Sequence, residues 1–490
     1  MRKFIIVIFL LYPIFFNSCA NQLPPSGGED DIIPPTVERI KPLPNTVNFP
    51  GNKIEIEFDE YVDRRSLRES LFISPKPKGE LEYNWSGKSV EIVFDEGLEK
   101  NRTYVFTIGT GLKDLRGGNA ITQPISFAIS TGATIDNGKI RGAVYDFSVS
   151  ETSSDKYKNL IICAYLKNKE INPEKDLPDF VTQVNQEGTY SFSNLPEGEF
   201  RLFAINDNDK NFLFDKNFDD ISIPSGDILI KDSLFINDVN FLMSFSQNYF
   251  VQNFYSFISK DGVPLGGVFS QFQSLKSQLT KDSSGLLYSS LKNYEQDFPP
   301  ELTSFFYFPS NDLSKIYITE NIKYSDTVSK KDYPLSYKWL NDSILEIRAR
   351  QLANPGSIVK VKIDFRTEGK QVNSTFILTI SEQRKMGKIE IRNQYDSLNL
   401  ICVILNKNNI YHYNVENLRG IANYTFDNLP QSEYRIFSFE DKNSNEIFDR
   451  GSYYPFIPSE RFYLSEKPIN TKGGWSGEVY IRLSAVLLGQ

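Results

Sequence analysis

Histidine is nearly absent from this sequence, with His412 the single one among 490 residues. The scarcity excludes zinc sites built from several histidines, and it excludes Ser-His-Asp and Cys-His relays unless His412 itself serves. His412 stands between two tyrosines in a polar stretch, which predicts a strand edge or a loop. Gly-rich phosphate loops, the Gly-x-Ser-x-Gly elbow and the metal-hydrolase helix motif are also missing. We therefore expect a protein that is not an enzyme.

Cysteine is scarce as well. Beyond Cys19, the chain contains only Cys163 and Cys402, each inside an apolar run that is typical of a buried strand. A disulfide between them would need an oxidising compartment. Because a repeat described below places them in separate domains, we expect both thiols to be free.

Clustered positive charge is lacking too. The sequence has 54 Lys and Arg against 62 Asp and Glu, a net charge of −8 without long blocks of one sign. Nucleic-acid backbones are bound by clustered cations, so we expect no nucleic-acid partner. Phe (38) and Tyr (26), by contrast, are abundant, and both favour half-buried strands. The chain is predicted to be all-β, and its length implies about three or four units.

The one long hydrophobic run lies at the N-terminus. Two basic residues precede residues 4–16, which are thirteen apolar or aromatic residues, and Cys19 follows shortly after. The run is too short to span a bilayer, which takes about 20 residues, and it fits the apolar middle of a signal peptide. The segment resembles a bacterial lipoprotein signal, in which residues 1–18 are removed and Cys19 is acylated, although Phe16 stands where leucine is usual. The alternative is a plain signal peptide with an incidental cysteine.

The lipoprotein resemblance implies a membrane anchor at Cys19. Two or three acyl chains hold a protein durably, whereas one chain does not. Residues 20–33 are polar and rich in Pro and Gly, which predicts a lipidated flexible tether over residues 19–33. When stretched, these fourteen residues reach roughly 45 to 50 Å. We expect a lipoprotein of the cell envelope that is anchored in the outer membrane. The sequence does not distinguish the periplasmic side of that membrane from the cell surface.

Residues 34–132 predict a sandwich of short strands. Residues 54–58, 90–94 and 104–108 alternate apolar and polar side chains, so each strand is expected to have one buried and one wet face. The residues that identify the segment are Phe58-Asp59-Glu60-Tyr61-Val62-Asp63, Trp85, Asn101-x-Thr103-Tyr104, Gly111-Leu112-Lys113-Asp114 and Ser130-Thr131-Gly132. They resemble the bacterial Ig-like domain named for the S-layer protein SbsA. Such domains are mainly spacers and interaction modules.

A duplication organises much of the remaining chain. Residues 190–203 (YSFSNLPEGEFRLF) recur as residues 424–437 (YTFDNLPQSEYRIF), at a constant separation of 234 residues. Tyr-x-Phe predicts a strand with both rings on one face, Asn-Leu-Pro a turn, and the remainder the returning strand. Each copy resembles the transthyretin-like or Cna B-type sandwich, also described as carboxypeptidase regulatory-like. We expect repeat 1 over residues 137–236 and repeat 2 over residues 385–490.

A weaker internal similarity lies in the segment between the two repeats. Residues 335–347 resemble residues 81–92, since both contain Leu-x-Tyr-x-Trp followed by an alternating strand. This predicts a second, diverged Ig-like unit over residues 237–384, with a polar and aromatic insertion around residues 270–300. The whole chain is then a row of tandem β-sandwich domains.

One pattern predicts a binding site. Residues with oxygen ligands occupy positions 1, 3, 5 and 9 of a loop in each repeat, namely Asp207, Asp209, Asn211 and Asp215, and then Asp441, Asn443, Asn445 and Asp449. The spacing suits a structural Ca²⁺ and resembles the first part of calcium-binding Asp-x-Asp-x-Asp loops. It departs from the EF-hand, which has glycine where Phe212 and Glu446 stand. Asp219 could close the first loop, and its counterpart in the second is Tyr453. Alternatively, these residues only favour turns.

Three classes of function follow. The first is a non-enzymatic, lipid-anchored scaffold or protein-binding module with an envelope protein as its partner. The second is a surface glycan-binding protein or adhesin that uses aromatic residues within 249–257 and 305–308. The third, a remote alternative, is a hydrolase with carboxylates from several domains. Neighbouring pairs such as Asp59-Glu60 argue against it, because adjacent strand residues face opposite sides and cannot easily flank one bond.

Overall fold

The computed structural model describes residues 31–146, 157–231, 235–243, 288–289, 300, 302–307, 322–339, 344–367, 370–406, 412–445, 448–465, 467–485 and 487–488. Within these ranges the regular structure consists of strands, the short helix α2 (Arg64–Ser70) and the 3-10 turn η4 (Gln383–Lys385). The predicted all-β class is therefore confirmed. No helix in the described part is long and apolar enough to cross a membrane. The expected signal peptide, Cys19 and most of the tether lie outside these ranges.

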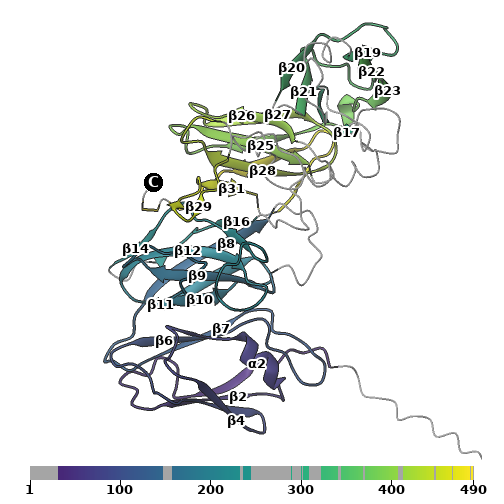
Figure 1. Ribbon diagram of the computed structural model, residues 1–490. Coiled ribbons are helices and arrows are strands. Elements are labelled where there is room, and N and C mark those ends of the chain that lie inside the picture. Colours follow the sequence, from purple (N-terminus) through teal and green to yellow (C-terminus); the bar gives the residue numbers. More distant parts are fainter. Residues whose placement is uncertain are drawn as a thin grey trace, which may run out of the picture.

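The first unit is a sandwich of two sheets, with strand orders β1-β2-β5-β4 and β3-β6-β7 (Figure 1). Its strands are β1 (Val37–Lys41), β2 (Lys53–Phe58), β3 (Leu71–Ser74), β4 (Leu81–Ser86), β5 (Ser89–Phe94), β6 (Thr103–Ile108) and β7 (Ile125–Ser130). Fully buried and less buried residues alternate along β2 and β5, as predicted. The prediction of one wet face is wrong for β6, which is buried throughout. Repeat 1 covers its outer face, where Val105 and Thr107 border the same small cavity as Phe180.

Repeat 1 has a sheet β10-β9-β12-β13, with β14 also paired to β12, facing a second sheet in which β8 pairs with β11, β15 and β16. The strands are β8 (Gly138–Asp146), β9 (Leu160–Leu166), β10 (Phe180–Gln183), β11 (Thr189–Leu195), β12 (Gly198–Asn206), β13 (Asp220–Ser222), β14 (Ile228–Ile230), β15 (Phe235–Ile236) and β16 (Phe241–Met243). Tyr190 and Phe192 lie buried on the same face of β11, with ring centroids 6.2 Å apart. The predicted Tyr-x-Phe strand is therefore present.

Repeat 2 is built the same way, with sheets β26-β25-β28-β31, to which β32 adds, and β27-β24-β33. The strands are β24 (Gly387–Arg392), β25 (Leu400–Asn406), β26 (His412–Asn417), β27 (Asn423–Leu429), β28 (Glu433–Glu440), β29 (Ser452–Tyr453), β30 (Phe456–Ile457), β31 (Phe462–Leu464), β32 (Ile469–Asn470) and β33 (Ser476–Tyr480). His412 begins an edge strand, as predicted. Cys163 and Cys402 are free and buried in β9 and β25.

The third unit contributes the sheets β17-β18-β21-β20 and β19-β22-β23. Its strands are β17 (Tyr288–Ser289), β18 (Thr303–Tyr307), β19 (Ile322–Asp326), β20 (Leu335–Trp339), β21 (Ile344–Ala349), β22 (Ile358–Thr367) and β23 (Lys370–Thr379). Trp339 pairs with Leu345 across β20 and β21, much as Trp85 pairs with Val90 across β4 and β5. Nearly all of the expected insertion around residues 270–300 lies outside the described ranges.

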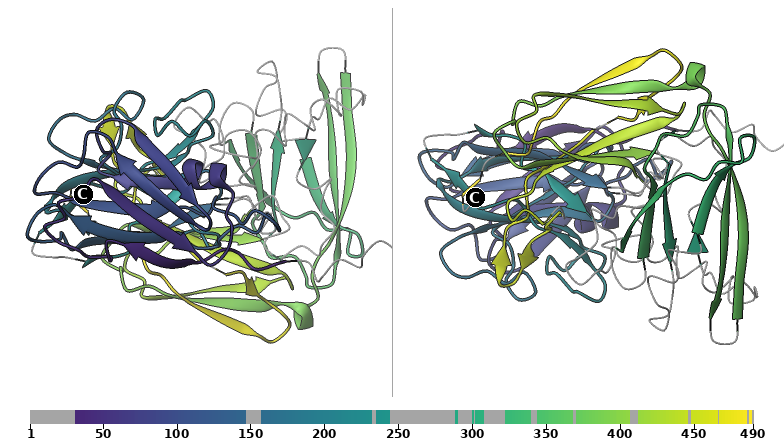
Figure 2. Two further views of the ribbon diagram at one scale, coloured as in Figure 1. Left: turned by 90° about the horizontal axis from the view of Figure 1, so that it is seen from below. Right: turned by 90° about the horizontal axis from the view of Figure 1, so that it is seen from above.

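The order of the units in space differs from their order along the chain. The first unit, repeat 1 and repeat 2 lie one after another, and the third unit lies beside and beyond repeat 2 (Figures 1 and 2). The two repeats are separated in sequence by the third unit, yet they pack against each other. Leu242 of repeat 1 shares one hydrophobic cluster with Phe437 of repeat 2, and Phe203 of repeat 1 shares another with Phe456 of the β29-β30 hairpin.

The end of the chain returns to repeat 1. The backbones of Leu488 and Asp227 exchange two hydrogen bonds, of 2.8 and 3.1 Å, and Leu487 is buried in the core of repeat 1. Figure 1 marks the C-terminus at the junction of the repeats. Gly226 is required for this approach, because a Cβ there would lie 2.4 Å from the Leu488 carbonyl oxygen. The final residues therefore complete a unit that begins at β8.

Candidate functional sites

Loop 1, residues 207–219, follows β12 and leads into β13. One carboxylate oxygen each from Asp207, Asp209 and Asp219 lies within 4.8 Å of the others. Asp207 and Asp219 are buried, with exposed fractions of 3% and 6%, whereas Asp209 is exposed. Asp219, which the spacing left as an optional ligand, thus belongs to the group.

The other two predicted ligands of loop 1 are engaged elsewhere. The Asp215 carboxylate accepts the backbone N–H of Asn217 at 2.8 Å. The Asn211 amide donates from Nδ2 to Asp209 at 2.7 Å, and its oxygen accepts the backbone N–H of Leu213 at 2.6 Å. The structure therefore brings two of the four predicted ligands together and adds Asp219.

Burial sets the electrostatics of loop 1. Burial raises the pKa of Asp207 to about 6, and a hydrogen bond with Asp209 and the charge of Asp219 act in the same direction. Hydrogen bonds from the backbone N–H groups of Phe212 and Asn211 only partly oppose this rise. Three carboxylates in one loop are a set of hard oxygen ligands of the kind that Ca²⁺ prefers.

Loop 2, residues 441–460, reproduces the hydrogen bonds of loop 1 with a different residue. In loop 1 the Asp219 carboxylate accepts the backbone N–H groups of Asn208 and Asp215, at 3.0 and 2.9 Å. In loop 2 the Glu460 carboxylate accepts those of the equivalent residues Lys442 and Asp449, at 3.0 and 3.1 Å. Glu460, and not Tyr453, is therefore the counterpart of Asp219 in this role.

A hairpin insertion explains why the constant separation between the two repeats pairs Asp219 with Tyr453 and not with Glu460. Asp219 lies four residues after Asp215, whereas Glu460 lies eleven residues after Asp449. The β29-β30 hairpin fills the difference. Each acid nevertheless comes shortly before a strand that pairs with the long strand of its repeat, β13 with β12 and β31 with β28. That position is the signal that sequence reasoning missed.

The two loops differ in how their charges are compensated. Burial raises the pKa of Glu460 to about 8, and the charges of Asp449 and Asp441 add to the rise. In loop 2 the amide groups of Asn443 and Asn445 donate to the same Asp449 oxygen, at 2.5 and 3.3 Å. In loop 2, amide donors therefore compensate the charge of the Asp449 carboxylate, whereas loop 1 brings three carboxylates together. Of the two loops, loop 1 has the set of carboxylates that better suits a cation.

Both loops lie at junctions between units. In loop 1, Lys210 pairs with Glu69 of α2 at 3.2 Å, and the Phe212 ring lies 5.7 Å from Phe72 of the first unit. In loop 2, the Tyr453 hydroxyl donates to Glu174 of repeat 1 at 2.8 Å. Each loop therefore connects its own repeat to the unit below it in Figure 1.

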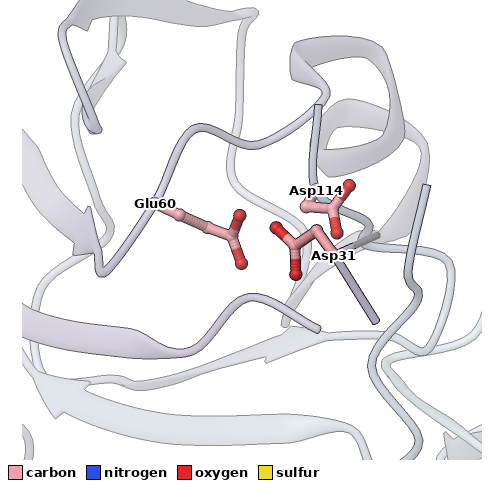
Figure 3. Close-up of side chains that lie close together, drawn as sticks. All are labelled: Asp31, Glu60 and Asp114. Atoms are coloured by element: carbon pink, nitrogen blue, oxygen red, sulfur yellow. The ribbon is translucent and has the colours of Figure 1, made fainter. Parts of the chain in front are cut away.

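A second acidic cluster lies where the chain enters the first unit. Figure 3 shows the carboxylates of Asp31, Glu60 and Asp114 close together, with one oxygen of each within 4.8 Å of the others. Burial and the neighbouring carboxylates raise the pKa of Glu60. Burial opposes the ionisation of Asp114, but hydrogen bonds led by the Asn119 side chain outweigh it and lower the pKa. Sequence reasoning missed this group, because its members come from three distant segments.

The remaining predicted sites are only partly covered by the structure. The proposed lipidation site, Cys19, lies outside the described residues, as do the aromatic residues within 249–257. Residues 305–307 belong to β18, and residue 308 lies outside.

Residues 31–131 match the family model described as "Bacterial Ig-like domain". No curated protein matches the chain. Among solved structures, an L,D-transpeptidase from Mycobacterium smegmatis aligns at 21% identity and a TM-score of 0.16, over 24% of this chain and 45% of that one. The N-terminal part of the bacterial S-layer protein SbsC aligns at 12% identity and a TM-score of 0.16, over 35% of this chain and 40% of that one. The major pilin subunit of Bacillus cereus aligns at 9% identity and a TM-score of 0.15, over 71% of this chain and 100% of that one.

The class assignment therefore rests on the first unit. That unit is a bacterial Ig-like domain by sequence and a two-sheet sandwich by structure. This chain spans less than half of the length of the transpeptidase and of the S-layer fragment.

Proposed function

We propose that this chain is a non-enzymatic, lipid-anchored protein of the cell envelope that acts as a scaffold or protein-binding module. The packing between units supports this proposal most directly. Side chains of loop 1, the β29-β30 hairpin and the C-terminal residues join the first unit and both repeats. A row of sandwiches joined by such contacts holds its shape, as a spacer that positions a partner needs to do.

The chemistry of the sites supports a structural role. The two acids with pKa values raised to about 6 and about 8, Asp207 and Glu460, accept N–H groups of their own loops. Perturbed carboxylates often mark catalytic centres, but structural networks also perturb them. The bond from Asn211 to Asp207 recurs in repeat 2 as a bond from Asn445 to Asp441, and the bonds to Glu460 recur in repeat 1 as bonds to Asp219. This recurrence favours a role in holding the loops.

The anchor is tested by Cys19→Ala. The variant is expected to move from the membrane fraction to the soluble fraction, while Ser18→Ala, which keeps the thiol, stays with the membrane. Mass spectrometry of the mature N-terminus gives a second readout of acylation. A wild-type chain that is soluble and unacylated would refute the lipoprotein proposal.

We further propose that loop 1 takes a structural Ca²⁺, with Asp207, Asp209 and Asp219 as its carboxylate ligands. Calorimetric titration of the full chain at pH 7.5 is expected to detect one site, which Asp209→Asn abolishes. Asn443→Ala, at the equivalent place in loop 2, serves as the control and is expected to leave that site intact. Equal calcium binding by Asp209→Asn and wild type would contradict the assignment.

A further inference from the structure

Two arginine–aromatic pairs lie side by side on the first unit, outside the acidic loops. Arg64 and Arg68 stand four residues apart on α2, so they share one face of the helix. Tyr83 and Trp85 stand two residues apart on β4, so they share one face of the strand. The guanidinium carbon of Arg64 lies 5.3 Å from the Trp85 ring centroid, and that of Arg68 lies 4.9 Å from the Tyr83 centroid.

The surrounding structure holds this arrangement in place. The Asp63 side chain caps α2 by accepting the backbone N–H groups of Arg65 and Ser66. Leu67, between the two arginines, is fully buried in the core of the unit. Both rings pack against the same core as partly buried side chains. The rings therefore form a fixed support under the two guanidinium groups.

Neither guanidinium is neutralised by a side chain in the part of the protein that the structure describes. Among the residues that the structure describes, no carboxylate lies within ion-pair distance of Arg64 or Arg68. The nearby acid Glu69 is occupied, because it pairs with Arg65 at 2.7 Å and with Lys210 at 3.2 Å. Both arginines are exposed to solvent. Two unpaired, oriented cations on a chain with a net charge of −8 form a local exception to its acidic character.

The chemistry of the pair selects a class of ligand. A guanidinium stacked on an aromatic ring keeps its N–H donors free at its edge, and its fork matches phosphate and carboxylate oxygens. Residues four apart on a helix have Cβ atoms about 5–6 Å apart, so both guanidinium groups can reach one phosphate group. Because the rings already restrict the side chains, binding loses less conformational entropy. We propose that Arg64 and Arg68, supported by Tyr83 and Trp85, bind a phosphoester, carried on a lipid headgroup or free in solution.

A purely structural role would produce the same ring contacts. Long arginine side chains also cover aromatic surface while their charged ends stay in water. The two roles differ in whether the N–H donors gain an anionic partner, which a binding measurement resolves. The proposal does not depend on lipidation of Cys19, and the test uses a chain without that residue.

The experiment uses residues 20–490 with Trp339→Phe and Trp475→Phe, which leaves Trp85 as the sole tryptophan. Trp85 fluorescence is followed during titration with phosphatidylglycerol vesicles, with phosphatidylcholine vesicles and with free glycerol 3-phosphate. A saturable change with phosphatidylglycerol alone identifies a lipid headgroup, whereas saturation by glycerol 3-phosphate identifies a free phosphoester. Either supports the proposal, and added salt is expected to weaken the binding.

The variants separate this site from general surface charge. The double variant Arg64→Gln/Arg68→Gln is expected to bind at least tenfold more weakly. Arg65→Gln, which removes an exposed arginine of the same helix that pairs with Glu69, is the matched control and is expected to bind like wild type. An unchanged melting temperature shows that each variant is folded. No saturable change with any anionic probe, or equal binding by the double variant and wild type, would overturn the proposal.

Discussion

Asp207 couples loop 1 to pH. Its pKa is raised from 3.8 to about 6, chiefly by burial, so between these values the folded chain binds more protons than the unfolded chain. Stability is therefore highest below about pH 4 for this group and falls as the pH rises through 6. At about 1.4 kcal/mol per pKa unit, the loss is on the order of 2–3 kcal/mol at most.

Hydrogen exchange at the Asn211 and Phe212 amides measures this effect locally. Both amides donate to the Asp207 carboxylate, and their protection, corrected for intrinsic exchange, is expected to fall between pH 4 and pH 7 in calcium-free buffer. Asp207→Asn does not titrate, so its protection should stay flat over the same range. A variant with the same slope as wild type would show that another group is responsible.

Some residue roles could be predicted from sequence and others could not. Asp207 and Asp209 were found because the loop spacing is itself a sequence pattern. Glu460 was missed because a hairpin insertion moves it out of register while leaving its hydrogen bonds unchanged. Asp31, Glu60 and Asp114 meet only after folding, so spacing along the chain carries no signal for them.

At the scale of elements, the strands of the first unit and of the repeats follow from local patterns. Alternation placed β2 and β5, and the repeated Tyr-x-Phe placed β11 and β27. Burial of both faces of β6 could not be predicted from its sequence, because the residues that cover its outer face belong to repeat 1. The return of the C-terminus had no signal either, since its contact with Asp227 spans much of the chain.

The C-terminal segment makes a specific prediction. Leu487→Ala removes a side chain that is 8% exposed in the core of repeat 1, and about 2–4 kcal/mol of stability should be lost. Leu488→Ala is the control, because that side chain is 43% exposed and its pairing uses only the backbone. Hydrogen exchange should accelerate in β8 and β12 of repeat 1 for Leu487→Ala. Acceleration confined to β24 and β28 would contradict this account.

At the scale of the whole molecule, the contact between the repeats sets the shape. Phe456 in the β29-β30 hairpin lies 3.7 Å from the Arg201 guanidinium carbon, measured to the ring centroid, and 6.1 Å from the Phe203 centroid. The same arginine forms a buried bidentate ion pair with Asp227, at 2.8 and 2.7 Å. The hairpin therefore anchors repeat 2 on a well-fixed part of repeat 1.

Phe456→Ala is expected to loosen this junction while both repeats stay folded. Solution X-ray scattering should show a larger radius of gyration, and limited proteolysis should cut faster between the repeats. The control is Ile457→Ala, which changes a neighbouring side chain that is 57% exposed. An unchanged scattering curve for Phe456→Ala would mean that the remaining contacts hold the repeats together on their own.

The position of Leu487 also has a consequence for biogenesis. A polypeptide emerges from the ribosome N-terminus first, so repeat 1 emerges long before Leu487, which packs into its core. Repeat 1 therefore stays incompletely packed until residue 487 has emerged. A polypeptide that stalls or terminates before residue 487 would thus carry a packing defect far upstream of the break.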